Sequence, residues 1–141
     1  MPTISGSCLC GAIHYTSSAQ PALTAFCHCR SCQKTGGGGY SVNVGVPAAS
    51  LQVQGTPQMY RTVGTSGLPV ERRFCSKCGS ALFTDAEAFG GITFVKGGSL
   101  DDASWIEPTL HIWCDSAQPW DKLPRGATCV QKNPSSALNA A

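Results

Sequence analysis

Seven of the nine cysteines in this chain of 141 residues fall into three short clusters. These are Cys8 and Cys10, then Cys27, Cys29 and Cys32, and finally Cys75 and Cys78. Thiols separated by one or two residues are typical of metal ligands and are hard to explain as core packing. We therefore expect the fold to be organised around bound metal, with zinc as the ion.

The redox state of these thiols follows from their number and context. Nine is an odd count, and the first residues show neither the basic region nor the apolar run of a secretory leader. Reduced thiols are therefore favoured over a disulfide scaffold, and we expect a cytoplasmic protein. Cys114 and Cys129 lie outside the clusters, and we interpret them as ordinary buried or surface thiols.

Charge and hydropathy limit the class of partner. The formal net charge is +2, and only 13% of the residues are charged. This balance argues against a binder of nucleic acid or of anionic membranes. The sequence has no apolar run of roughly 18 residues, which argues against a membrane-spanning helix. We expect small molecules as partners.

The sequence predicts a mainly β fold with minimal helix. Its 16 glycines and 9 prolines indicate many turns and short strands. Residues 40–46 alternate most clearly, with Tyr40 and three valines on one face and small or polar residues on the other. Other strands are expected at residues 11–16, 22–27, 51–54, 58–63, 70–74, 81–83, 91–95 and 109–113, and short helical pieces at 85–89 and 100–104. We expect one domain over residues 1–132 and a disordered tail over 133–141.

The spacing of the cysteines also predicts how they divide between ions. Residues i and i+2 of a strand face the same side, so Cys8 and Cys10 can bind one ion together, as can Cys27 and Cys29. A CxxC pair needs a tight turn, for which Gly79 supplies a permissive backbone. Structural zinc takes four protein ligands, whereas reactive zinc keeps three and an open position. Seven ligands therefore divide naturally into four and three.

In this division a closed structural site takes the first and last pairs, and an open site takes the central cluster. The structural ligands are Cys8, Cys10, Cys75 and Cys78, and the open site has Cys27, Cys29 and Cys32. The alternative is a zinc ribbon built from Cys29, Cys32, Cys75 and Cys78. The separation of its two pairs is longer than the roughly 15–20 residues of a compact ribbon, and three cysteines are left without a role.

The order of the motifs CxC, CxCxxC and FCxxCG resembles the glutathione-dependent formaldehyde-activating enzyme family, which includes relatives of centromere protein V. The last motif begins at Phe74, and His111-Ile112-Trp113 with Pro119-Trp120 resembles the closing segment of the family. The resemblance implies several small coiled antiparallel β-sheets around a structural zinc. It also implies a second zinc that accepts the sulfur of glutathione, and it assigns the same two ligand sets.

The activity implied by the resemblance is that of a carbon–sulfur lyase of the S-(hydroxymethyl)glutathione synthase type. Glutathione or a similar thiol, bound at Cys27, Cys29 and Cys32, attacks an aldehyde such as formaldehyde or is released from the adduct. Glutathione is anionic, so a basic neighbour is expected. Arg30 and Lys34 flank the cluster and are the first candidates, followed by Arg61, Arg72 and Arg73.

Other functions are compatible with the same thiols. A zinc module could bind a protein partner without catalysis, or the three-cysteine site could serve thiol redox chemistry or metal storage. His28 is interpreted either as a proton shuttle or as a hydrogen-bonded residue on the far face of the strand. His111 and Trp113 either line a pocket or pack in the core.

Overall fold

The computed structural model describes residues 4–107 and 109–134. These residues form a mainly β fold, which confirms the predicted class. The strands are β1 (Ile4–Ser7), β2 (His14–Ser17), β3 (Leu23–Cys27), β4 (Ser41–Pro47), β5 (Leu51–Gln54), β6 (Gln58–Val63), β7 (Pro69–Phe74), β8 (Ala81–Ala86), β9 (Ile92–Lys96), β10 (Leu110–Ile112) and β11 (Thr128–Cys129).

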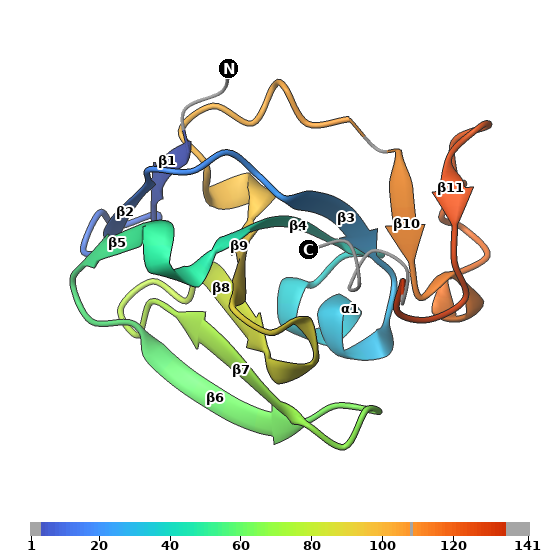
Figure 1. Ribbon diagram of the computed structural model, residues 1–141, viewed down its shortest axis with the longest axis horizontal. Coiled ribbons are helices and arrows are strands. Elements are labelled where there is room, and N and C mark those ends of the chain that lie inside the picture. The colour runs from blue at the N-terminus through green and yellow to red at the C-terminus, as the bar shows by residue number, and fades with distance from the viewer. Residues whose placement is uncertain (1–3, 108, 135–141) are drawn as a thin grey trace.

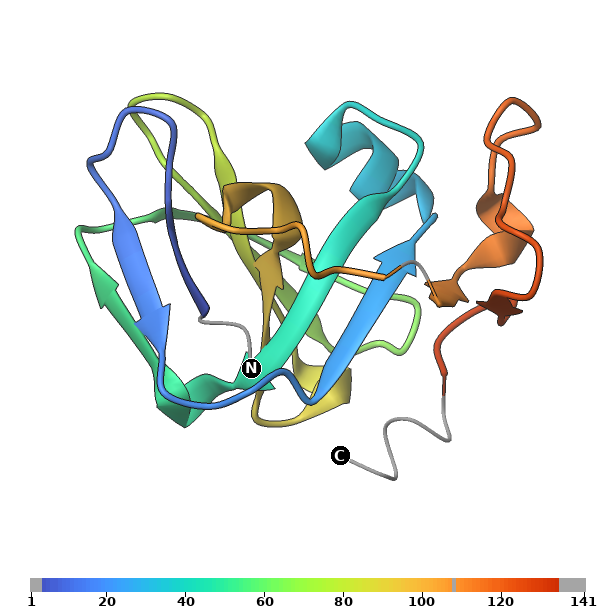
Figure 2. The same cartoon turned by 90° about the horizontal axis from the view of Figure 1, so that it is seen from above.

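The strands of the described residues form two sheets. The smaller is antiparallel with the order β1-β2-β5, and the larger has eight strands in the order β11-β10-β3-β4-β9-β8-β7-β6. The larger sheet is antiparallel except at one edge, where β10 lies parallel to both β3 and β11. Figures 1 and 2 place the smaller sheet and the β10–β11 edge at opposite ends of the molecule, with β3 and β4 between them. The parallel edge brings the C-terminal part of the chain beside the strand that ends at Cys27.

The alternation along β4 gives the larger sheet two different faces. Val44 is aligned with Val95 of β9, which is aligned with Phe83 of β8, and all three are buried in one hydrophobic core. Asn43 and Gly45 point to the opposite face, because successive side chains of a strand alternate. The predicted alternation of residues 40–46 is thus confirmed. One face packs on the core, and the other is left to line a pocket.

Helical structure is sparse, as predicted, and its positions differ from those predicted. Within the described residues the α-helix is α1 (Arg30–Gly36), where the sequence predicted a tight turn after Cys29. The helix forms because the Cys29 side chain caps it and Gly37, at φ +80°, ends it in the left-handed conformation that glycine adopts at low cost. Short 3-10 helices occur at Ala48–Ser50, Glu87–Phe89, Gly97–Ser99 and Cys114–Ser116.

Of the two predicted helical pieces, residues 85–89 divide between the end of β8 and the 3-10 helix Glu87–Phe89, and residues 100–104 are not helical. The predicted domain over residues 1–132 stays a prediction. Asn133 and Pro134 are described, whereas the remainder of the predicted tail, residues 135–141, lies outside the described residues. No helix in the described part of the chain is long and apolar enough to cross a membrane.

Candidate metal centres and the adjoining pocket

The first and last cysteine pairs meet in space. The sulfur atoms of Cys8, Cys10, Cys75 and Cys78 all lie within 4.8 Å of one another. The Cys8 and Cys10 sulfurs are 3.7 Å apart, and those of Cys10 and Cys75 are 3.8 Å apart. A zinc–sulfur distance of about 2.3 Å sets a sulfur–sulfur edge of about 3.8 Å in a tetrahedron. These separations therefore fit a tetrahedral zinc ion.

Two turns create this four-cysteine cluster. The amide of Gly11 donates to the carbonyl of Cys8 at 3.1 Å, and the amide of Gly79 donates to the carbonyl of Cys75 at 2.8 Å. Both glycines have φ near +80°, at +79° and +78°, a region that other residues rarely adopt. The Leu9 amide also donates to the Ser80 hydroxyl at 3.0 Å, which ties the two turns together.

The local geometry of the CxC pairs differs from the prediction. Cys8 and Cys10 lie in the turn after β1 rather than in a continuous strand, and the side chain of Leu9 between them is 88% exposed. Cys27 ends β3, whereas Cys29 is the N-cap of α1. A turn and a helix start thus bring the thiols together, because they bend the chain around a point as an extended strand does not.

The central cysteines form a second cluster, in which the sulfurs of Cys27, Cys29 and Cys32 lie within 4.8 Å of one another. The Cys32 amide donates to the Cys29 sulfur at 3.3 Å. The neighbouring thiols of Cys29 and Cys32, together with burial, raise the pKa of Cys27. Hydrogen bonds from Cys27 and Cys29 lower the pKa of Cys32, and the nearby charge of Lys96 acts in the same direction. Three crowded thiols cannot all ionise without a cation, so this donor set fits a soft divalent metal such as zinc.

The structure therefore brings together the two sets of cysteines that the spacing predicted. The sulfurs required for a ribbon of Cys29, Cys32, Cys75 and Cys78 lie in separate clusters. Cys114 and Cys129 belong to neither cluster. They are free thiols, the first partly buried and the second exposed.

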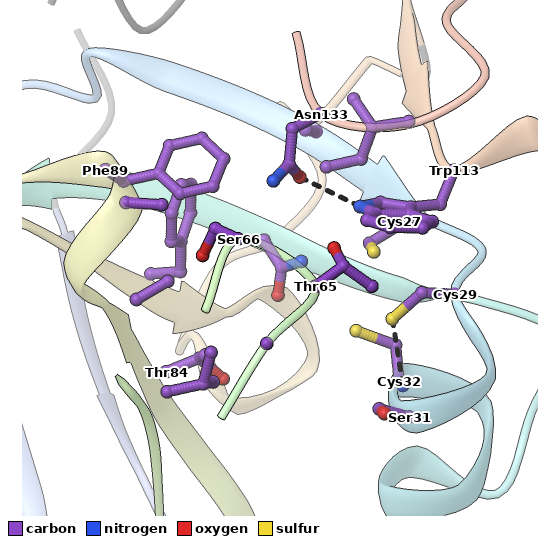
Figure 3. Close-up of a pocket in the computed structure, with 18 of the residues that line it drawn as sticks. Cys27, Cys29, Ser31, Cys32, Thr65, Ser66, Thr84, Phe89, Trp113 and Asn133 are labelled. Atoms are coloured by element: carbon purple, nitrogen blue, oxygen red, sulfur yellow. Dashed lines mark hydrogen bonds between the residues drawn. The ribbon is translucent and has the colours of Figure 1, made fainter. Parts of the chain in front are cut away.

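A pocket of about 330 Å³ adjoins the three-cysteine cluster. Cys27, Cys29 and Cys32 line one end of it, as Figure 3 shows. The eight-stranded sheet supplies a wall, and Trp113 and Asn133 close a corner through a hydrogen bond of 2.8 Å between the indole nitrogen and the amide oxygen. Trp113 has φ +58°, an uncommon backbone conformation for a bulky residue. None of the cysteines of the four-cysteine cluster lines this pocket.

The cations of the pocket are only partly those expected from the sequence. Arg30 lines the pocket, but Lys34 is exposed on the last turn of α1 and does not contribute to the lining. Arg72, a secondary candidate, lines it from β7. Lys96 was not anticipated. It lies at the end of β9, where its ammonium donates to the Asn43 side chain at 2.7 Å.

Lys96 lies close enough for its charge to act on the thiols. Burial lowers its pKa, and the charges of Cys32 and Cys27 oppose that effect. Its position follows from the strand register, since Lys96 is aligned with Asn43, which is aligned with Ala25 two residues before Cys27. The signal available in the sequence was a basic residue directly after the strand predicted over residues 91–95.

The two histidines of interest are buried together. His28 Nε2 lies 2.8 Å from His111 Nδ1, and the two rings stack with their centroids 5.1 Å apart. The hydrogen bond expected of His28 is therefore present, but His28 follows β3 rather than lying on a face of that strand. Trp113 lines the pocket, whereas His111 is buried and does not contribute to the lining.

The relationship of the chain to known proteins agrees with the motifs. A family model described as glutathione-dependent formaldehyde-activating enzyme matches residues 3–116. The chain belongs to this family. A curated protein from Halomonas elongata, named "Putative glutathione-dependent formaldehyde-activating enzyme", is 42% identical over 127 residues, which cover 85% of this chain and 80% of that protein.

The fold of this protein also has a counterpart among solved structures. A crystal structure of a Rhodobacter sphaeroides protein matches with a TM-score of 0.56 and 21% sequence identity, covering 74% of this chain and 92% of that one. At this identity the likeness concerns the fold alone.

Proposed function

We propose that this protein is a zinc-dependent carbon–sulfur lyase of the S-(hydroxymethyl)glutathione synthase type. It binds glutathione or a similar thiol at the three-cysteine cluster, and it forms or cleaves a thiol–aldehyde adduct. The observation that carries the proposal is that Cys27, Cys29 and Cys32 supply three ligands at the end of an open pocket. Family membership and the name of the Halomonas relative support it.

Two zinc ions per chain fit the thiols. Cys8, Cys10, Cys75 and Cys78 would hold a structural ion, and the three-cysteine cluster would hold the reactive one. When bound there, zinc supplies electrostatic stabilisation of an incoming thiolate at neutral pH. Because these ligands must stay reduced, we also propose a cytoplasmic location.

The reaction needs no oxidant or reductant. A sulfur lone pair forms the carbon–sulfur bond, the π electrons of the carbonyl move to its oxygen, and that oxygen takes up the proton that the thiol has lost. The reverse step returns the electrons and the proton. Lys96 lies in the pocket near the thiols, so we assign its ammonium to stabilise the negative charge that develops on the carbonyl oxygen.

The opposite wall supplies contacts for the charged groups of the thiol. Arg72 Nε and Thr84 Oγ1 are buried, and neither has a hydrogen-bond partner among the described residues. Arg72 and Thr84 are aligned on neighbouring strands, and both line the pocket. Buried polar groups normally have hydrogen-bond partners, so these two unpaired atoms indicate that a ligand with acceptor oxygens binds here. A carboxylate of glutathione fits them, with Arg30 as a second cation near the cluster and Lys34 as an outer one.

Exchange between S-(hydroxymethyl)glutathione and free formaldehyde tests this proposal. Exchange measured by NMR should be fast with the zinc-loaded protein, and lost with Cys29→Ser. Lys96→Met should slow it by about 100-fold, the usual effect of removing a group that stabilises an oxyanion. Lys122→Met removes an exposed lysine as a matched control.

Zinc-edge X-ray absorption provides a second test that does not depend on turnover. Glutathione should add a sulfur ligand to one of the two zinc ions. Unchanged coordination at saturating thiol would contradict the proposal and would favour a non-catalytic zinc module or a metal store.

A further inference from the structure

The pocket beside the three-cysteine cluster has one distinctly apolar part. We call it the apolar lobe, and its residues are Leu23, Ala25, Ala86, Ala88, Phe89 and Phe94. Figure 3 shows Phe89 at the end of the pocket opposite to Cys27, Cys29 and Cys32. The metal ligands and the apolar lobe therefore share one pocket but occupy its two ends.

The strand register sets the distance between these ends. Leu23 precedes Cys27 by four residues on β3, which corresponds to about 13 Å along a strand. Leu23 is aligned with Gly45 on β4, and Gly45 is aligned with Phe94 on β9. A group attached to sulfur at the cysteines thus needs several carbon atoms to reach Phe94.

The lobe has a packed aromatic wall. The rings of Phe89 and Phe94 meet edge to face, with centroids 4.8 Å apart and an interplanar angle of 88°. Gly45 leaves room for this arrangement, because a Cβ atom there would lie 3.1 Å from Cε1 of Phe94 and 3.1 Å from Cγ2 of Ile92. Phe94 is itself buried, so the wall is part of the folded structure rather than a loose surface group.

Neither glutathione nor formaldehyde matches this lobe. Glutathione carries two carboxylates, an ammonium group and two amides, which would lose their hydration against Leu23 and Phe94 without gaining partners. Arg72 and Thr84 continue the cross-strand row beyond Phe94, and their buried polar atoms suit those groups better. Formaldehyde has only hydrogen atoms on its carbonyl carbon, so its adduct would leave the lobe unfilled.

We propose that the apolar lobe binds the alkyl or aryl substituent of the aldehyde, so that the preferred substrate is a thiol adduct of an apolar aldehyde larger than formaldehyde. This inference rests on the proposed function, whose chemistry at the sulfur is unchanged. The thiol carrier lies along Arg72 and Thr84, and the substituent extends toward Phe89 and Phe94. Neighbouring polar and apolar parts of one sheet wall therefore select the two halves of one adduct.

Unreactive thioethers isolate this binding step from turnover. Isothermal titration calorimetry of the zinc-loaded protein would compare S-methylglutathione with S-hexylglutathione. Each buried methylene strengthens binding by about fourfold, so burial of only about half of the additional methylenes should already make the hexyl compound bind about 30-fold more tightly. Equal affinities for the two compounds would overturn the inference.

Two variants test whether the lobe is the source of this preference. Ala86→Phe fills the lobe and should bring the hexyl-to-methyl affinity ratio close to one. Phe89→Ala removes part of its wall and should lower the ratio by at least about fivefold. Met59→Ala is the matched control, since Met59 is half-exposed and is aligned with Arg73 on the other face of the sheet. Zinc content and thermal melting of each variant show whether it is folded, and the ratio within one variant does not depend on the amount of active protein.

The possible outcomes distinguish a failure of the inference about the apolar lobe from a failure of the proposed lyase chemistry. A hexyl preference that both lobe variants reduce and Met59→Ala retains supports the inference. A preference for the hexyl compound that survives Ala86→Phe would mean that the hexyl group binds outside the apolar lobe, which contradicts the inference. If formaldehyde exchange persists while the two thioethers bind equally, the inference fails and the proposed function stands. If exchange is absent but the preference is present, the lobe is retained and the lyase chemistry fails.

Discussion

Asp121 lies against His28, the residue between two of the candidate zinc ligands. Asp121 Oδ2 lies 3.1 Å from His28 Nδ1, and His28 is completely buried. The carboxylate favours the proton on Nδ1, which leaves Nε2 to accept from His111 Nδ1 at 2.8 Å. Because the His28 amide also donates to the Ile112 carbonyl at 3.0 Å, the chain between Cys27 and Cys29 is fixed at three points.

Removing this carboxylate should destabilise the fold. Asp121→Leu removes the carboxylate that faces the buried imidazole at ion-pair distance, so the free energy of unfolding should fall by about 1–3 kcal/mol. Asp121→Asn can present an amide oxygen in the same place, and it should cost less than half as much. Urea unfolding monitored by circular dichroism measures both. Equal losses would mean that packing alone determines the contribution of Asp121.

The two cysteine clusters should respond differently to loss of one thiol. Cys75 lies in the main hydrophobic core at 1% exposure, so Cys75→Ser should release the structural zinc and lower Tm by more than about 10 °C. Cys32→Ser should leave a folded protein with about one zinc ion per chain instead of two. Native mass spectrometry and thermal melting measure these effects. The assignment of roles is reversed if Cys32→Ser unfolds the chain and Cys75→Ser does not.

Ser80 should increase the zinc affinity of the four-cysteine site. Its hydroxyl lies 3.2 Å from the Cys78 sulfur, and this hydrogen bond is the main reason that the pKa of Cys78 is lowered to about 5. Ser80→Ala should raise that pKa, so protons compete better for the ligand and zinc is released at a higher pH. We expect zinc affinity to fall by about tenfold, measured by competition with a chromophoric chelator between pH 5 and 8. Ser76→Ala, an exposed change in the same turn, should behave like the wild type.

Tyr15 should make the fold sensitive to alkali. Burial raises its pKa to about 12, from an ordinary value of 10.0. The neutral hydroxyl is favoured in the folded state, so its contribution is complete below pH 10 and is lost as the pH rises toward 12. We expect a loss of about 2 kcal/mol over this window.

Tyr15→Phe should remove this dependence of stability on pH. It should cost about 1 kcal/mol at pH 7, because the hydroxyl of Ser99 loses the Tyr15 hydroxyl at 2.6 Å and keeps only the Lys96 carbonyl at 2.7 Å. Tyr60→Phe alters a tyrosine that is 62% exposed and should keep the wild-type slope. Denaturant titrations at pH 9, 10, 11 and 12 give the comparison. A Tyr15→Phe slope equal to that of the wild type would assign the alkaline sensitivity to other groups.

The parts of the fold that could be predicted are those in which neighbours in the sequence are also neighbours in space. Thiols one or two residues apart can share an ion whether a strand, a turn or a helix start carries them, so the two clusters were predicted even though their local geometry was not. Residues 40–46 likewise revealed their two faces, because alternation is a local property of a strand.

The candidate site was harder to predict, because cross-strand register assembles it. Lys96 is distant in sequence from Cys27, yet the alignment of β3, β4 and β9 brings it to the pocket, whereas Lys34, which is close in sequence, points to solvent. The sequence by itself determined a mainly β chain with two sets of thiols of unequal number. Only the tertiary structure decided that the incomplete set faces a pocket with an apolar far end, because alignment between distant strands sets which side chains share a wall.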